Sequence, residues 1–162
     1  MQRIGVIGAG LMGNGIAHVA AQAGYDVMLS DVDEGRAAAG KATVEKNLAR
    51  MVAKEKIGQS DADEALARIG TTGDNGDLAD CDLVIEAATE NEAVKRKIYE
   101  SLSLKDGAIL ASNTSSISIT DLASSSSEPN RFIGIHFFNP VPMMSLVEII
   151  PILMPFSPSI SN

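Results

Sequence analysis

A chain of 162 residues, 45% of them hydrophobic, is long and apolar enough to bury a core, and one domain is the natural expectation. The formal net charge of −8 argues against nucleic-acid binding, because a nucleic-acid-binding face is usually basic. No apolar run approaches the roughly 18 residues that cross a bilayer, and the single cysteine suits a reducing compartment, so the sequence predicts a cytoplasmic protein without a membrane segment.

The first expected strand, residues 4–7, runs directly into a glycine-rich turn. Gly8, Gly10 and Gly13 have the spacing G-x-G-x-x-G, and a helical pattern follows. In a strand–turn–helix context this spacing is typical of a dinucleotide site. The first glycine allows the tight turn, the second lets the backbone approach a pyrophosphate, and the third lets the helix pack against the strand. The free N–H groups at the helix start then favour phosphate binding.

The second expected strand, residues 27–29, leads to Asp31, 18 residues beyond Gly13. A dinucleotide fingerprint expects an acid about 20 residues on, where it accepts hydrogen bonds from the adenosine ribose. An acid there also repels a 2′-phosphate, so the sequence favours NAD(H) over NADP(H). The alternative interpretation is a solvated turn residue beside Asp33, and the complete fingerprint favours the cofactor role.

Two helices, over residues 32–57 and 60–69, are expected before the next strand, and this excursion is longer than most strand-to-strand connections. Its lysines, Lys54 among them, most simply form a solvated face, although one of them could meet an anionic substrate. The later expected strands are 83–87, 108–111, 132–135 and 146–150, and the later helices are 92–102 and a short piece through 119–122. This alternation predicts an α/β fold with a doubly wound, mostly parallel Rossmann-type sheet.

Ligands of such sheets bind at the carboxyl ends of the strands, and the polar residues of this chain follow that rule. The strand ends carry the glycine turn, Asp31, residues 86–90, residues 113–116 and His136. The cluster Ser112-Asn113-Thr114-Ser115-Ser116 has two interpretations. Its hydroxyl and amide groups could orient a substrate oxygen, or Ser115 or Ser116 could cap the following helix.

Hydride transfer to a nicotinamide requires a group that moves the accompanying proton, and histidine suits this role near neutral pH. His18 lies in the first helix and is expected to be structural or exposed, whereas His136 ends a strand close to Asn139. A lone histidine of this kind is often structural. Glu148, however, interrupts an apolar strand, and a buried carboxylate needs a partner, so we expect Glu148 to pair with His136 and orient its ring.

Taken together, these residues resemble the L-3-hydroxyacyl-CoA dehydrogenase family, and within it the bacterial 3-hydroxybutyryl-CoA dehydrogenases. The resemblance extends from Ile4 to Ile150 and rests on four stretches: GAGLMG (8–13), IEAATEN (85–91), SNTSS (112–116) and HFFNPVP (136–142). The last two are long and specific, whereas many NAD enzymes share the first.

The resemblance implies oxidation of an (S)-3-hydroxyacyl-CoA to the 3-oxoacyl-CoA with NAD⁺, and the reverse reaction. It implies His136 as the general base, Glu148 as its orienting partner and Ser115 as the residue that hydrogen-bonds the substrate's 3-oxygen. Asn139 and Lys54 are implied on the substrate side, Lys54 near a CoA phosphate. The implied cofactor contacts are Gly8, Gly10, Leu11, Met12, Gly13, Asp31, Ala87, Glu90, Lys95 and Asn113. No metal site is expected.

The chain departs from the family after Ile150. Three prolines, at positions 151, 155 and 158, forbid a helix there, so we expect an NAD-binding domain over residues 1–150 and an irregular tail over 151–162. The family continues with the end of the cofactor domain and a helical domain that builds the acyl-CoA pocket and the homodimer. We expect a truncated chain that lacks this part. The alternative function is therefore an incompetent NAD-binding remnant or binding module, since dinucleotide binding does not need the substrate pocket.

Overall fold

The computed structural model describes residues 1–153. The expected irregular tail over 151–162 begins too early, because Pro151 still belongs to the last strand, opposite Ile133. From position 154 onward this tail lies outside the described residues. The strands are β1 (Arg3–Ile7), β2 (Asp26–Ser30), β3 (Ile69–Thr72), β4 (Leu83–Glu86), β5 (Ile109–Ser112), β6 (Phe132–Phe137) and β7 (Val147–Pro151). The helices are α1 (Leu11–Gln22), α2 (Glu34–Ala53), α3 (Gln59–Ala67), α4 (Glu92–Ser101) and α5 (Ile119–Ala123), with short 3-10 turns η1 (Asn75–Leu78), η2 (Pro129–Arg131) and η3 (Val141–Met143).

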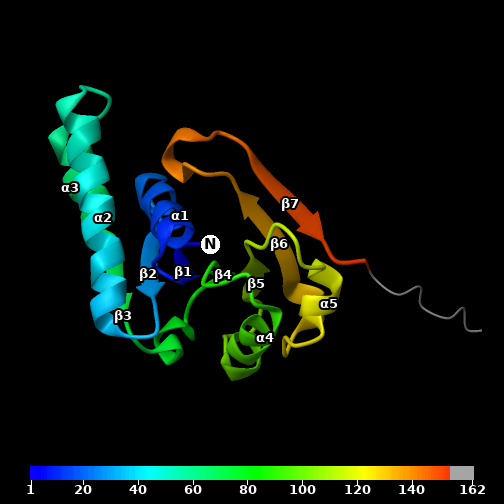
Figure 1. Cartoon of the computed structure of the whole chain (residues 1–162). Helices are drawn as coiled ribbons and strands as arrows, with labels where there is room; N and C mark the ends of the chain where they lie inside the picture. The colour runs from blue at the N-terminus through cyan, green and yellow to red at the C-terminus, as the bar shows by residue number, and fades with distance from the viewer. Residues whose placement is uncertain (154–162) are drawn as a thin grey trace, which may run out of the picture.

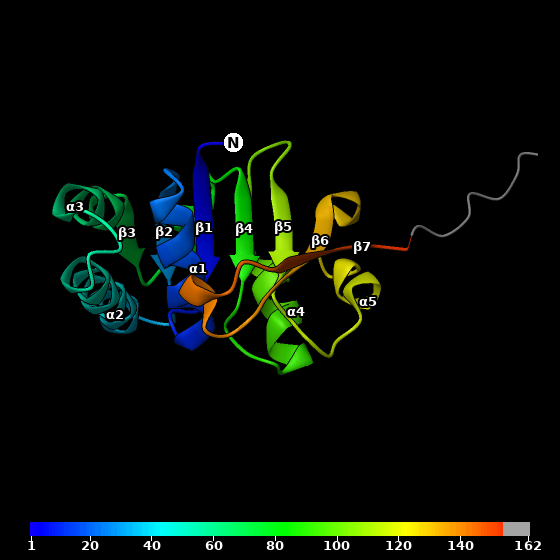
Figure 2. The same ribbon diagram turned by 90° about the horizontal axis from the view of Figure 1, so that it is seen from above.

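All seven strands belong to one sheet in the order β3-β2-β1-β4-β5-β6-β7. Figure 2 shows the first six side by side in this order. These six are parallel, and β7 runs antiparallel to β6 at the edge. Helices connect most of the neighbouring parallel strands, as parallel pairing requires a crossover connection. The predicted Rossmann-type, mostly parallel sheet is therefore confirmed.

Helices cover both faces of the sheet. On one face, α1, α2 and α3 pack on the sheet through a core that includes Ile16, Val44 and Ala65. On the other face, α4 and α5 pack through Tyr99, Leu122 and their neighbours. The predicted helical excursion is the pair α2 and α3, which lie side by side at one end of the molecule (Figure 1).

Two expectations need correction at element level. The second helix of the excursion ends at Ala67, and Ile69 instead opens β3, where it is buried opposite Val27 of β2. The helix after the serine cluster is capped by Ser118, whose hydroxyl accepts from the backbone N–H of Asp121, and not by Ser115 or Ser116. Within residues 1–153 no helix combines the length and the apolar character needed to cross a membrane.

Candidate active site

The glycine turn joins β1 to α1 and has the geometry of a phosphate cradle. Gly8 has φ +97°, a conformation that side chains disfavour, and a Cβ there would lie 2.5 Å from Cα of Ala88. A Cβ on Gly13 would lie 1.6 Å from the carbonyl oxygen of Gly8, so only glycine fits. Gly10 is different: nothing lies within 4 Å of its Cβ position, and it caps α1 without a side-chain hydrogen bond. The helix start therefore faces open space that suits a pyrophosphate.

Asp31 lies at the end of β2 beside this turn. Its carboxylate accepts from the backbone N–H of Ala9 at 2.7 Å and from that of Val32 at 2.7 Å. Asp31 lines two hollows of the surface, one together with Leu11 and the other together with Asn75. The predicted acid is thus positioned next to the glycine turn.

A buried polar network lies behind the strand ends. Glu86, at the end of β4, and Lys95, on α4, are 0% and 1% exposed, and their Oε2 and Nζ atoms are 2.6 Å apart. The Tyr99 hydroxyl donates to the same oxygen at 2.6 Å, and burial together with the charge of Glu86 raises the pKa of this phenol. The Ser112 hydroxyl is also within 3.4 Å of Oε2.

This network sets the place of Lys95, an implied cofactor contact. Its ammonium is enclosed against Glu86, so a direct contact with a cofactor would require it to turn away from that carboxylate. In the observed position Lys95 acts on the site indirectly, because it holds the carboxylate of Glu86 in place. Glu86 Oε1 accepts from the N–H of Ala88, the residue that lies against Gly8, and the Glu86 carbonyl accepts from the N–H of Asn113. The N–H of neighbouring Ala87 donates a hydrogen bond to the carbonyl of Ile7.

Glu90 joins the loop after β4 to the loop after β5. It accepts from the Thr114 hydroxyl at 2.6 Å and from the Ser115 N–H at 3.3 Å. Ser115 itself is exposed at this edge of the sheet. Asn113 links the same loop to β6, because its Oδ1 accepts from the N–H of Phe137 at 2.9 Å. The implied residue Asn113 is therefore tied to the strand that carries His136, and Ser115 is tied to Glu90.

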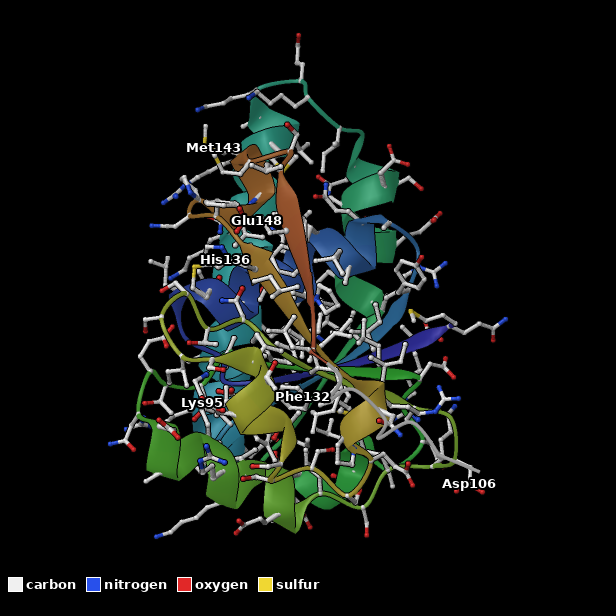
Figure 3. The ribbon with its side chains drawn as sticks, turned by 90° about the vertical axis from the view of Figure 1, so that its right-hand side faces the viewer. Lys95, Asp106, Phe132, His136, Met143 and Glu148 are labelled. Carbon is white, nitrogen blue, oxygen red and sulfur yellow. The ribbon has the colours of Figure 1, made fainter. Side chains whose placement is uncertain are left out.

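The structure brings His136 and Glu148 together. They are directly opposite each other in the β6–β7 register, and His136 Nδ1 is 2.9 Å from Glu148 Oε2. Figure 3 shows the two side chains adjacent on neighbouring strands, with Met143 at the turn beyond them. The expectation that Glu148 lies in a buried strand is wrong: β7 is an edge strand, all of its residues are exposed, and the Glu148 side chain is 51% exposed. The ring of Phe138 lies 4.6 Å from that of His136.

A cavity of about 490 Å³ opens beside this segment, between α1, the end of α2 and η3. Its lining includes Lys54, and it also contains residues that the sequence reasoning missed: His18, Asn47, Arg50, Met51, Lys56, Pro140, Pro142 and Met143. Asn47, Arg50 and Lys54 are spaced i, i+3, i+7, so helical periodicity could have placed them on one face. Asn139, an implied substrate contact, is exposed just before Pro140. His18, expected to be structural or exposed, is fully buried in α1.

A parallel sheet with a glycine turn after β1 and an acid after β2 defines a dinucleotide-binding domain of the Rossmann class. The chain belongs to the 3-hydroxyacyl-CoA dehydrogenase family. The family model described as "3-hydroxyacyl-CoA dehydrogenase, NAD binding domain" matches residues 3–154. Its cofactor is accordingly NAD.

Individual relatives support the assignment. The chain is 58% identical to a 3-hydroxybutyryl-CoA dehydrogenase of Bradyrhizobium diazoefficiens, over 93% of this chain and 52% of that protein. It is 45% identical to one of Mycobacterium tuberculosis, over 95% and 55%. The crystal structure of (S)-3-hydroxybutyryl-CoA dehydrogenase from Ralstonia eutropha matches with a TM-score of 0.89 and 48% identity, over 92% of this chain and 53% of that one. The chain thus spans about half the length of these relatives.

Proposed function

We propose that this chain carries the NAD-binding and proton-transferring half of a 3-hydroxyacyl-CoA dehydrogenase site, with His136 as the general base. The observation that carries the proposal is the His136–Glu148 contact. Because Glu148 engages Nδ1, Nε2 is the ring nitrogen left to accept a proton. The hydrogen bond from Phe137 to Asn113 supports a common site with Ser115, two residues beyond Asn113.

In the proposed oxidation, His136 Nε2 accepts the proton of the substrate's 3-hydroxyl, and a hydride acceptor would be needed for the hydrogen on carbon 3. NAD⁺, when bound, supplies that hydride acceptor. Ser115 donates a hydrogen bond to the 3-oxygen and so fixes its distance from His136. Glu148 stabilises the imidazolium that forms, and reduction of a 3-oxoacyl-CoA runs the same steps backward.

We expect His136→Gln to lower the turnover of acetoacetyl-CoA with NADH by about 10²- to 10⁴-fold, the usual contribution of a general acid–base group. Glu148→Gln keeps a polar contact and removes the charge, so its loss should be smaller, about 10- to 100-fold. The measurement is loss of NADH absorbance, with NADH affinity titrated by fluorescence in parallel. Unchanged NADH affinity in both variants is the control, and full turnover in His136→Gln would refute the proposed base.

The same proposal assigns the cavity to the CoA portion of the substrate. Arg50, Lys54 and Lys56 give it a cationic rim, whereas Met51 and Met143 give it an apolar wall. CoA, with phosphates at one end and the less polar pantetheine arm at the other, matches that distribution. Pro140, which lines the cavity, follows His136 by four residues in the chain.

We expect Lys54→Ala to weaken CoA binding several-fold at low salt and to reduce its salt dependence, because a phosphate contact is screened by ions. Lys46→Ala is the matched control, since Lys46 is exposed on the same helix and does not line the cavity. Isothermal titration of CoA at two salt concentrations makes the comparison. Equal effects of the two substitutions would refute the proposed contact between Lys54 and CoA.

A second candidate function, an NAD-binding module without turnover, is favoured by one feature. The Glu148 side chain is 51% exposed and that of His136 is 20% exposed, so in the described residues water reaches the pair through Glu148. Dehydrogenase sites usually exclude water during hydride transfer. NADH binding by the unaltered chain without turnover of acetoacetyl-CoA would establish this second function.

A further inference from the structure

The hydroxyl of Thr114 is the centre of a hydrogen-bonded turn in the loop after β5. Thr114 is 2% exposed, and residues 113–118 belong to no helix or strand, so no ladder of backbone hydrogen bonds fixes their shape. The hydroxyl donates to Glu90 Oε2 at 2.6 Å and accepts from the N–H groups of Ser116 at 3.3 Å and Ile117 at 3.2 Å. A threonine hydroxyl has one donor and two acceptor lone pairs, and all three are used here. Its role therefore lies within the protein, since no capacity is left for a ligand.

Ser115 lies inside this turn, and its backbone is held on both sides. Its own N–H donates to Glu90 Oε1 at 3.3 Å, while the Thr114 hydroxyl donates to Oε2 of the same carboxylate. On the other side, the N–H of Ser116 donates to the Thr114 hydroxyl. Ser115 is nevertheless exposed at this edge of the sheet. An exposed serine is thus carried on a backbone that the side chains of Thr114 and Glu90 hold in place.

A separate contact ties Thr114 to the core. Its N–H donates to the Ser112 hydroxyl at 3.4 Å, and that hydroxyl lies 3.4 Å from Glu86 Oε2 in the buried network. Loss of the Thr114 hydroxyl alone would leave this backbone contact in place, together with the pairing of β5 with β4 and β6. The effect of the hydroxyl on Ser115 can therefore be separated from its effect on the fold.

We propose that Thr114 is a positioning residue for the reaction, which fixes the place from which the Ser115 hydroxyl bonds the substrate's 3-oxygen. This inference rests on the proposed dehydrogenase function. A hydrogen bond weakens steeply as its distance and angle leave the ideal range. A misplacement of about 1 Å at a reacting centre can lower the rate about 10²-fold. Ser115 would touch the substrate, and Thr114 would act only through Ser115.

Thr114→Val removes the hydroxyl and keeps the branched shape of the side chain. We expect kcat for acetoacetyl-CoA with NADH to fall about 10- to 100-fold, with KM for acetoacetyl-CoA within about twofold, because the lost precision concerns the reacting oxygen. Thr114→Ser keeps the hydroxyl and should retain most of the turnover. Ser118→Ala is the matched control, since it removes the cap of α5 in the same segment and lowers stability without touching Ser115. An equal loss of kcat in Ser118→Ala and Thr114→Val would refute the inference, because loosening of the segment would then explain both.

A double-mutant cycle tests whether Thr114 acts through Ser115. In a chain that already carries Ser115→Ala, Thr114→Val should lower kcat by less than about threefold, because the group that it positions is gone. Equal losses with and without Ser115→Ala would overturn the inference. Lowered kcat in Ser115→Ala with none in Thr114→Val would refute the role of Thr114 and leave the proposed function intact. No turnover by the unaltered chain would refute both.

Discussion

Gly13→Ala is expected to abolish NADH binding and to lower the free energy of unfolding by at least about 3 kcal/mol, the upper end of ordinary overpacking. Its new Cβ would lie 1.6 Å from the carbonyl oxygen of Gly8, and a backbone atom cannot move aside as a side chain can. The strand and the helix would have to separate where the phosphate cradle forms. Urea unfolding and fluorescence titration with NADH measure the two effects.

Gly10→Ala is the matched control within the same turn. Its Cβ would meet nothing within 4 Å, and the backbone at Gly10, φ −67° and ψ −165°, suits alanine. We expect stability within about 1 kcal/mol of the unaltered chain, since alanine is only a poorer helix cap than glycine. NADH affinity should nevertheless fall, because the methyl group enters the space where a pyrophosphate approaches. Tight NADH binding by Gly10→Ala, or normal stability of Gly13→Ala, would contradict this account of the turn.

Lys95→Met should have the largest effect on stability outside the turn. It leaves the carboxylate of Glu86 fully buried without its cation, and removal of one partner of a buried pair costs about 3–5 kcal/mol. That is a large share of the roughly 5–15 kcal/mol that typically stabilises a domain. NADH affinity should fall as well, because Glu86 holds Ala88 against Gly8.

Two further variants make this prediction specific. Lys97→Met, on the exposed side of α4, should change the free energy of unfolding by no more than about 0.5 kcal/mol. Adding Glu86→Gln to Lys95→Met should recover part of the lost stability, because the uncompensated charge is then gone. Urea unfolding of the three variants at neutral pH is the measurement. A loss below about 1 kcal/mol in Lys95→Met would show that the pair is not what holds this part of the fold.

The parts of the molecule that the sequence predicts well are those encoded by neighbouring residues. Apolar runs such as residues 83–85 define buried parallel strands, and the G-x-G-x-x-G spacing defines the turn, because both depend on local backbone geometry. Strand ends then collect at one edge of the sheet, which is why Asp31 and His136 could be placed there before the structure was known.

The errors arise where the outcome depends on distant partners. The pattern of residues 146–150 is that of a buried strand, and periodicity cannot reveal that β7 lies at an edge with exposed side chains. Lys95 carries a charge on a helix that faces solvent for much of its surface, and only the position of Glu86, nine residues earlier, explains its burial. The cavity joins α2 to η3, segments far apart in the sequence, so no local pattern indicates it.

The pairing of β6 with β7 means that the proposed proton acceptor and its partner are coupled through the main chain. His136 and Glu148 meet because their strands are in one particular register, and side chains alternate between the two faces of a sheet. A shift of one residue would therefore turn Glu148 to the opposite face and put an isoleucine or a valine across from His136. The length of the connection over residues 138–146 thus helps to set the register of β7 on β6. Insertions or deletions there should separate His136 from Glu148 even though neither residue is altered.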